Sequence, residues 1–328
     1  MMYRELCAKV HKKLIQILGR WAYPSYWRYQ TRGKAEHADL SNIYFTALPN
    51  PGAGIGHQMS NWISGYCWAK YFHLNFAHLP FSTRAWDDFL GFGKDEVQVS
   101  ELKKKGWHIR RIPYFQWNDQ QSIELTRNII CSYSGKKVVI LCEQDQGYRN
   151  LYDAMDDMKT KFYDSTVQAK GRLTYDDAHF NVAIHVRRGD IMSNPTNENL
   201  AMRFLSNGYY ERVLQQVVER YSQTQAKPVH IYFFSQGKQE DFPEFSCFNN
   251  LHWCLDMGAQ DSFLHMVYAD LLITSKSSFS YKPALMNSGI KVCPEKFWHT
   301  YPDTEDWIMC DNDGNVHWKT NPAVIKTC

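Results

Sequence analysis

The amino-acid sequence predicts an α/β protein built from two Rossmann-like domains. Short apolar runs rich in β-branched residues alternate with longer stretches of helical character, as in parallel sheets covered by helices. The 328 residues are about the length of two domains. A composition of 44% hydrophobic and 22% charged residues is that of a globular protein, which excludes a disordered or fibrous chain.

Five runs are short and apolar enough to be strands buried on both faces of a sheet. They are Ile43–Leu48, Val138–Cys142, Val182–Val186, His230–Ser235 and Leu271–Thr274. We predict one helix at Gln58–Phe72, after a glycine-rich loop, and another at Tyr209–Tyr221, whose apolar residues recur at helical spacing. A further helix leads into the last strand, and the next one starts near Ser280.

The polar stretch Gln168–Asp177 is the predicted domain boundary. It separates residues 36–170 from residues 171–328, and each part holds the pattern of one Rossmann-like unit. Two such units that face a cleft form the architecture called GT-B.

The first 35 residues differ from the rest of the chain in charge. They carry eight basic groups and one acid, so this segment is +7 and the remaining 293 residues are −4. The segment is also rich in aromatic residues: Trp21, Tyr23, Tyr26, Trp27 and Tyr29. One interpretation is an anchor at a membrane surface, where basic groups attract anionic headgroups and aromatic rings settle at the interface. The other is a solvated basic helix packed on its own domain.

Composition also bears on location and partners. The net charge of +3 is too small for a dedicated nucleic-acid binder. No apolar run reaches the length of a transmembrane helix, and lysines interrupt the apolar N-terminal stretch, which argues against a signal peptide. The nine cysteines lack metal-binding or redox spacing, so we interpret them as mostly reduced thiols. We therefore expect a cytoplasmic protein, peripheral on the cytoplasmic face of a membrane under the anchor interpretation.

The segment Val182–Asp190 carries the most informative motif, which reads His185-Val-Arg187-Arg188-Gly-Asp190. Its charges emerge at the carboxyl end of a buried strand, where open α/β sheets bind ligands. Arginine there can hold a diphosphate by charge-assisted hydrogen bonds and stabilise it as a leaving group. Asp190 can pair with the other arginine and fix its rotamer. The alternative is an ion-pair network at a strand end without a ligand.

A glycine-rich loop joins the first predicted strand to its helix. Gly52, Gly54 and Gly56 permit a tight turn and close approach of a ligand to the backbone, and the following helix N-terminus favours anions. The spacing is neither the dinucleotide fingerprint nor a P-loop. A purely structural turn is the alternative.

A serine-rich turn follows the last predicted strand. One interpretation is that the hydroxyls and free backbone N–H groups of Ser277, Ser278 and Ser280 bind phosphate oxygens. The alternative is that these serines only cap the following helix. Near the end of the chain, Asp311-Asn-Asp313-Gly matches a metal-binding pair of aspartates, but we favour a hairpin turn, which needs the same residue types.

In this order, the three motifs Gly-x-Gly-x-Gln, His-x-Arg-Arg-Gly-Asp and Ala-Asp-x-x-Ile-x-x-x-Ser-Ser-Phe-Ser resemble the fucosyltransferase superfamily of α1,2-, α1,6- and protein O-fucosyltransferases. The last two look most like the α1,2-type enzymes. The resemblance covers about residues 43–300. It implies a GT-B fold that binds GDP-fucose mainly through the C-terminal half, needs no divalent metal or other cofactor, and inverts the anomeric centre.

The resemblance also implies roles for residues. Arg187 contacts the β-phosphate and is catalytic, His185 lies near the guanine, and Asp261 reads the guanine edge. Arg188 and Asp190 hold the motif together. The remaining donor-binding residues are Ser277, Ser278 and Phe279, which line phosphate and base, and Gly54, Gly56, His57 and Gln58, which close the cleft from the other domain.

The sequence departs from the family pattern in two of the motifs. His57 stands where asparagine is usual, and Tyr281-Lys282 replaces an aromatic pair. Glu198, in the loop after the arginine motif, is the candidate catalytic carboxylate.

The expected function is transfer of L-fucose from GDP-fucose to a glycan hydroxyl, α1,2 to galactose in a surface polysaccharide or glycolipid, with a lipid-linked oligosaccharide as one form of the acceptor. The alternatives are another GDP-deoxysugar such as colitose as donor, and a nucleotide- or glycan-binding module without turnover. The sequence indicates no oligomeric state.

Overall fold

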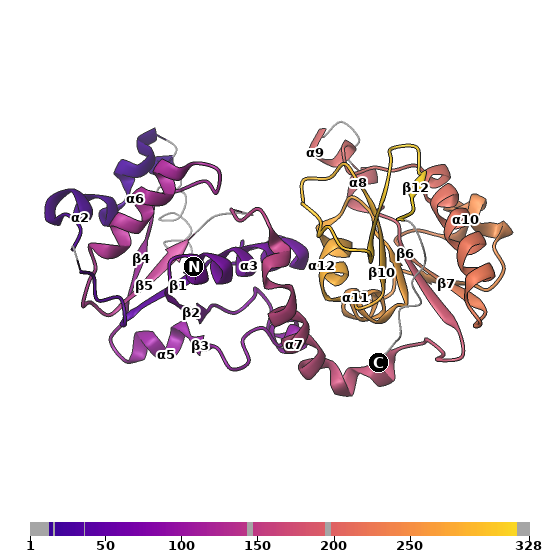
Figure 1. Cartoon of the computed structure of the whole chain (residues 1–328), viewed down its shortest axis with the longest axis horizontal. Helices are drawn as coiled ribbons and strands as arrows, with labels where there is room; N and C mark the ends of the chain where they lie inside the picture. Colours follow the sequence, from indigo (N-terminus) through magenta and orange to yellow (C-terminus); the bar gives the residue numbers. More distant parts are fainter. Residues whose placement is uncertain (1–12, 16, 36, 143–146, 194–197, 320–328) are drawn as a thin grey trace. The chain divides into compact units, whose positions relative to one another are not determined.

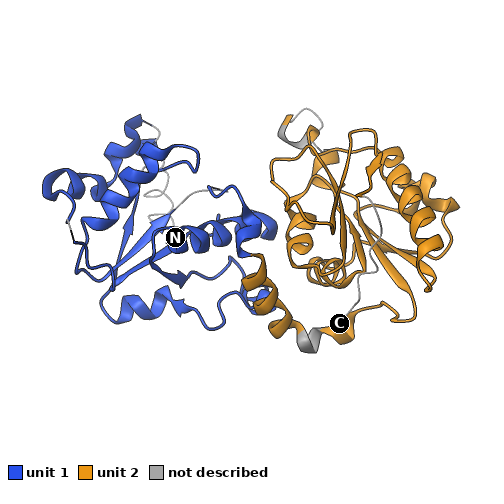
Figure 2. Ribbon diagram, viewed as in Figure 1, with its two compact units in different colours: residues 1–154 blue, residues 155–328 orange. Residues whose placement is uncertain are grey.

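The computed structural model describes residues 13–15, 17–35, 37–142, 147–193 and 198–319. The chain divides into two compact units, Met1–Ala154 and Met155–Cys328 (Figure 2). Each unit is a parallel sheet covered by helices, apart from one short antiparallel edge strand in the second unit. The predicted α/β class with two Rossmann-like units is confirmed.

Unit 1 holds a five-stranded parallel sheet in the order β3-β2-β1-β5-β4 (Figure 1). Its strands are β1 (Ile43–Ala47), β2 (Asn75–His78), β3 (Val97–Gln98), β4 (His108–Arg111) and β5 (Val138–Cys142). Its helices are η1 (Gly19–Ala22), α2 (Pro24–Arg32), α3 (Ile55–Tyr71), α4 (Arg84–Leu90), α5 (Val99–Lys104), α6 (Gln120–Cys131) and η2 (Leu151–Ala154). The apolar strands β1 and β5 lie at the centre, and the polar strand β4 lies at the edge.

Unit 2 holds a seven-stranded sheet in the order β12-β11-β10-β9-β6-β7-β8. Its strands are β6 (Phe180–His185), β7 (Val229–Ser235), β8 (Leu251–Leu255), β9 (Leu271–Ile273), β10 (Ile290–Pro294), β11 (Trp307–Cys310) and β12 (Val316–His317). The helices are α7 (Met155–Thr166), η3 (Val167–Arg172), α8 (Asp190–Ser193), α9 (Glu198–Ala201), α10 (Asn207–Thr224), η4 (Gln239–Asp241), η5 (Pro243–Cys247), α11 (Ala259–Tyr268) and α12 (Ser278–Met286). Every strand that the sequence predicts is therefore present, within a residue or two at its ends.

The core of unit 2 explains why β6 is so regular. All six residues of β6 are buried, because helices cover both faces of the sheet at this strand. On one face the amphipathic helix α10 contributes Tyr210, Val213, Leu214 and Val217 to a continuous apolar cluster with β6 and β7. The strand therefore holds the arginine motif that follows it on a rigid support.

The unit boundary lies at Ala154, whereas the sequence predicts it near residue 170. The difference arises because α7 packs on the second unit: the Tyr163 hydroxyl donates to the Met286 carbonyl at 3.1 Å, and the Phe162 and Phe263 rings lie 5.9 Å apart. A polar stretch in the sequence does not reveal which sheet a helix beside it covers.

The described part of the N-terminal segment belongs to unit 1, and Ile15 and Ala22 already pack against its core. Tyr23 and Tyr26 are buried in the same core cluster as β1 and β5. The Ser25 hydroxyl donates to the Arg111 carbonyl at 2.6 Å, and Arg28 donates to the Ser132 carbonyl at 3.0 Å. This part of the segment packs on its own domain, while residues 1–12 lie outside the described residues. The membrane-anchor interpretation stays a prediction.

The structure also bears on the predicted thiols and on the predicted lack of a transmembrane helix. The cysteines in the described part of the chain, from Cys67 to Cys310, are all free thiols. Within the same part, every helix is too short or too polar to cross a bilayer.

Lys282 on α12 is fully buried, and its ammonium group has no hydrogen-bond partner among the described residues. Its Nζ lies 4.9 Å from the centre of the Tyr281 ring, and burial lowers the pKa of this amine well below its usual value. An unpartnered buried polar group costs about 1–3 kcal/mol. We therefore expect Lys282→Met to raise the midpoint of urea unfolding measured without nucleotide. Exposed Lys296→Met is the control for loss of one charge, and a lower midpoint for Lys282→Met than for the control would contradict this account.

Candidate functional site

The site lies where the chain reverses its direction across the sheet of unit 2. From β6 the chain passes to β7 and β8 on one side, and α11 then returns it to β9 on the other side of β6. The carboxyl ends of β6 and β9 therefore flank a topological switch point, the position where open α/β sheets bind ligands. The arginine motif follows β6, and the serine-rich turn follows β9.

His185 connects these two loops. It is the last residue of β6, it is buried, and its Nδ1 lies 2.7 Å from the Ser275 hydroxyl. Its ring also contacts that of Phe279, with 5.6 Å between centroids. Burial, reinforced by the Arg187 charge, lowers the pKa of His185 to about 3, so the ring is neutral near pH 7. His185 thus acts here as a neutral hydrogen-bonding group.

Arg187 projects from the loop after β6 toward the serine-rich turn. Its Nη1 donates to the Ser277 hydroxyl at 3.4 Å, and its Nη2 lies 2.6 and 2.8 Å from the two carboxylate oxygens of Asp190. Its Nε is buried and has no hydrogen-bond partner among the described residues. The guanidinium is thus held by a carboxylate and a hydroxyl beside the N-terminus of α12.

The partner of Asp190 corrects the sequence interpretation. We expected Asp190 to pair with the second arginine, but it binds Arg187. The reason is geometric: Asp190 is three residues after Arg187, at the start of α8, whereas Arg188 points to the α10 side of the loop. Asp190 therefore sets the rotamer of the arginine that faces the switch point.

The N-terminus of α12 faces the same place through its cap, Ser277. The Ser277 hydroxyl accepts from the Phe279 backbone N–H at 3.2 Å, so the capping interpretation holds, and the same oxygen contacts Arg187. A helix N-terminus carries partial positive charge and free N–H groups that suit anions. Ser278 points elsewhere, because its hydroxyl lies 3.0 Å from Nε2 of His299. The N-terminus of α12 and Arg187 therefore place hydrogen-bond donors at the same position, with Asp190 balancing the Arg187 charge.

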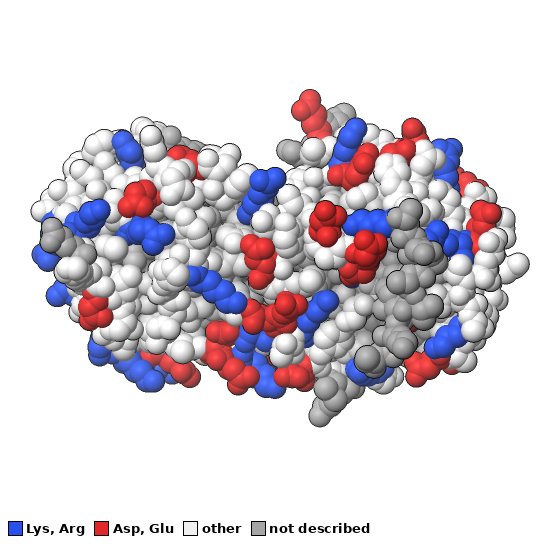
Figure 3. Space-filling view, viewed as in Figure 1, with Lys and Arg blue, Asp and Glu red and all other residues white. Residues whose placement is uncertain are grey.

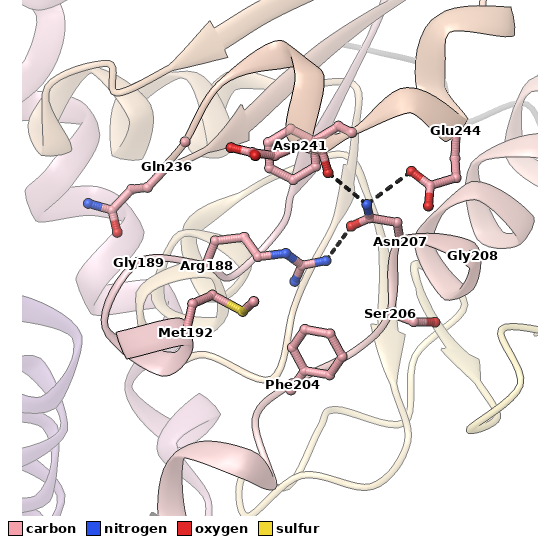
Figure 4. Close-up of a pocket in the computed structure, with 12 residues that line it drawn as sticks. Arg188, Gly189, Met192, Phe204, Ser206, Asn207, Gly208, Gln236, Asp241 and Glu244 are labelled. Carbon is pink, nitrogen blue, oxygen red and sulfur yellow. Dashed lines mark hydrogen bonds between the residues drawn. The ribbon is translucent and has the colours of Figure 1, made fainter. Parts of the chain in front are cut away.

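Arg188 lies beside a separate pocket of about 570 Å³, drawn in Figure 4. It is buried, donates to the Leu205 carbonyl at 3.1 Å and to the side chain of Asn207, and lies over the Phe204 ring at 4.9 Å. Asn207 in turn donates to Glu244 Oε2 at 3.0 Å. These contacts hold the loop after β6 against α10, which fits the predicted structural role of Arg188.

Gly189 has a conformational reason to be glycine. Its φ is +70°, in the left-handed region that favours glycine. The chain can thus turn sharply between Arg188 and Asp190. As a result, Arg188 contacts the start of α10, whereas Asp190 contacts Arg187.

Asp261 lies in the first turn of α11, which starts from the carboxyl end of β8. Its carboxylate pairs with Arg172, and its backbone carbonyl accepts from Nδ1 of the buried His265 at 2.7 Å. Phe263 on the same helix contacts Phe279 at 6.0 Å between ring centroids. Asp261 thus lies at the carboxyl edge of the sheet, the same edge as the arginine motif. To bind a guanine, its carboxylate would have to release Arg172. The guanine-binding role of Asp261 stays a prediction.

Glu198 is the first residue of the short helix α9 and is exposed. The residues just before it, 194–197, lie outside the described residues. Its assignment as a catalytic carboxylate stays a prediction.

The glycine loop belongs to unit 1, where it follows β1 at the switch point between β1 and β5. Helix α3 begins at Ile55 rather than at Gln58, because Gly54 already serves as its N-cap. Gln58 is buried, and its side chain bridges to Ser82, donating to the hydroxyl and accepting from the backbone N–H, both at 2.8 Å. His57 lies 3.4 Å from the Asn50 amide. These contacts give Gln58 a structural role, and donor binding by Gly54, Gly56, His57 and Gln58 stays a prediction.

The aspartates near the C-terminus form a turn. Asp311 Oδ1 accepts from the backbone N–H groups of Asp313 and Asn315 at 2.9 and 2.8 Å, between the antiparallel strands β11 and β12. In the described part of the chain, no group of three or more His, Cys, Asp or Glu side chains is placed to hold a metal ion.

Sequence reasoning missed the polar residues beside Arg188. They come from the start of α10 and from the loop after β7: Asn207, Gln236, Asp241 and Glu244. The predicted end of β7 at Ser235 was the available signal, because the residues after it emerge at the same edge of the sheet as the arginine motif.

No protein-family model and no curated protein matches the chain. Among solved structures, it is similar to POFUT1 in complex with GDP-fucose, with 13% identity over 77% of this chain and 96% of that one and a TM-score of 0.47. It is also similar to the fucosyltransferase NodZ from Bradyrhizobium, with 10% identity over 86% of this chain and 98% of that one and a TM-score of 0.46. Scores at this level assign neither family nor function.

Proposed function

We propose that the chain is a glycosyltransferase that moves L-fucose from GDP-fucose to a hydroxyl of a glycan. The observation that carries the proposal is the Arg187 guanidinium, which Asp190 and Ser277 hold at the switch point of unit 2, beside the N-terminus of α12. This donor set suits a diphosphate, and the motif that supplies it resembles that of fucosyltransferases.

The chemistry requires stabilisation of a leaving group. The bond between the sugar C1 and the β-phosphate oxygen breaks, and its electron pair leaves with GDP. Arg187 and the α12 N–H groups then bind the charge that accumulates on the β-phosphate, which lowers the barrier more than it strengthens ground-state binding. Asp190 keeps the guanidinium in place, and the neutral His185 joins the two loops.

The acceptor hydroxyl forms the new bond to C1 and loses its proton. Attack from the face opposite GDP inverts the anomeric centre, and Glu198 is the proposed base for this proton. Because Arg187 and the helix terminus supply the positive charge, the reaction needs no divalent metal in this proposal.

The finer assignments belong to the same proposal. The donor-binding set is completed by Asp261 toward the guanine, and the acceptor is galactose, linked α1,2, in a surface polysaccharide or glycolipid. The enzyme would act on the cytoplasmic face of a membrane. GDP-colitose is the alternative donor.

The test is release of GDP from GDP-fucose by the purified chain in the presence of EDTA, across galactose-terminated acceptors. We expect release that one acceptor stimulates. Binding of GDP without release from GDP-fucose, GDP-mannose or GDP-colitose would replace the enzyme by a binding module. Absence of any affinity for guanine nucleotides would overturn the whole proposal.

A further inference from the structure

A groove of about 1200 Å³ runs along β4, the exposed edge strand of unit 1. All four residues of β4, His108–Arg111, contribute to its lining, together with the start of α2 and the residues just before β5. Apolar side chains form much of the remaining lining: Tyr23, Leu48, Leu79, Tyr133, Val138 and Leu141. The groove thus combines an apolar surface with the polar edge of a sheet.

The charge of this groove has a single sign. Its basic lining residues are Arg28, Arg110, Arg111, Lys136 and Lys137, whereas no Asp or Glu occurs among the described residues that line it. In Figure 3, Lys and Arg side chains lie along the left margin of unit 1, with Asp and Glu side chains between them. The positive charge of the groove lining attracts an anionic ligand.

Four basic residues of the groove, Arg28, Arg110, Lys136 and Lys137, form no ion pair with a described carboxylate. Arg110 donates to a backbone carbonyl at 3.0 Å, and Lys137 lies over the Trp107 ring at 4.6 Å. Arg28 donates to the Ser132 carbonyl and lies over the Tyr133 ring at 4.6 Å. These four positive groups are therefore available to phosphates.

An exposed apolar cluster adjoins the groove along the chain. It consists of Leu14, Ile17, Leu18, Trp21 and Trp27. Ile17 is 69% exposed, and the rings of Trp21 and Trp27 lie 5.2 Å apart. Residues 22–25, which lie between these tryptophans, line the groove. Large apolar side chains gathered on a surface mark an interaction site, and tryptophan is favoured at the membrane interface.

We propose that the β4 groove binds the phosphate headgroups of an anionic lipid bilayer, while the exposed apolar cluster enters the interface of that bilayer. The two surfaces supply the two contributions that membrane attachment requires, electrostatic attraction and apolar burial. A nucleic acid would satisfy the charges alone and leave the apolar cluster in water. The bilayer satisfies both.

The proposed lipid site belongs to unit 1, whereas the proposed donor site belongs to unit 2. A membrane-bound glycan acceptor would then lie on the surface to which the enzyme attaches. Vesicle binding needs neither donor nor acceptor, so its failure and the failure of sugar transfer are measured separately.

The experiment is co-sedimentation of the full chain with sucrose-loaded vesicles. We expect binding to an equal mixture of phosphatidylglycerol and phosphatidylcholine, and little binding to phosphatidylcholine alone. The double variant Arg110→Glu/Lys137→Glu should bind at least about tenfold more weakly, since each basic group at an anionic surface contributes a severalfold gain. Trp21→Ser/Trp27→Ser, which changes exposed residues only, should also weaken binding.

Lys103→Glu/Lys104→Glu on α5 is the matched control, because it makes the same change in net charge at exposed positions outside the groove. Equal losses in the control and in the groove variant would overturn the proposal, as would failure of the wild type to bind anionic vesicles. Displacement from vesicles by a single-stranded oligonucleotide that the groove variant fails to bind would assign the groove to nucleic acid instead.

Discussion

Replacing Arg187 by alanine is expected to lower kcat for GDP release about a hundredfold to a thousandfold, with a smaller change in the KM for GDP-fucose. The charge on the β-phosphate grows as the bond to the sugar breaks, so a guanidinium aimed at that oxygen is most effective in the transition state. Arg187→Lys keeps the charge but loses the fork of donors, and we expect an intermediate rate. Steady-state kinetics with saturating acceptor measures both variants.

The matched control is Arg84→Ala, which removes an arginine that is 92% exposed and pairs with Asp88 at the surface of unit 1. Its activity should equal that of the wild type. An Arg187→Ala enzyme with wild-type kcat would show that the positive charge at the switch point is not used in the reaction.

Stability is expected to fall steeply between pH 6.5 and pH 4, because two buried histidines must remain neutral in the folded chain. Burial lowers the pKa of His185 to about 3 and that of His265 to about 4. In the unfolded chain both titrate near their ordinary pKa, so the unfolded state binds more protons as the pH falls and folding loses stability. Each histidine contributes a loss of up to about 3 kcal/mol at pH 4.

The contacts of His265 show why its proton is excluded. The Thr174 backbone N–H donates to its Nε2 at 3.0 Å, so Nδ1 carries the proton and donates to the Asp261 carbonyl. Protonation of Nε2 would break the hydrogen bond that it accepts from the Thr174 backbone N–H.

Urea unfolding at a series of pH values measures this dependence. His185→Asn should flatten the curve between pH 6.5 and pH 4, because it removes one of the two titrations. Exposed His73→Asn, at a positive φ that asparagine tolerates, should leave it unchanged. A wild-type unfolding free energy that does not change over this range would contradict the burial of neutral imidazoles.

The central strands could be predicted from the sequence because both their faces are buried, so their residues form continuous apolar runs. The runs at β5 and β6 are of this kind. The edge strand β4 reads His-Ile-Arg-Arg, and three of its four residues are exposed, so no pattern distinguishes it from a loop. Because these residues are exposed, β4 has no apolar pattern that would identify it in the sequence. The same exposed residues line the basic groove.

The position of the arginine motif could be predicted as well, since polar residues directly after a buried strand must emerge at its carboxyl end. The contacts that the motif makes could not be predicted. The pairs His185–Ser275 and Arg187–Ser277 exist because β9 lies next to β6, and strand order is a nonlocal property. Likewise, the choice of Arg187 over Arg188 by Asp190 depends on the turn at Gly189.

Calorimetric titration of GDP into the full chain in the presence of EDTA, with UDP as comparison, measures whether unit 2 holds a diphosphate site. We expect one site per chain that prefers GDP, that Arg187→Ala weakens and that Arg84→Ala leaves intact. Absence of GDP binding, or equal binding by the wild type and Arg187→Ala, would contradict a diphosphate site at the junction of β6 and β9.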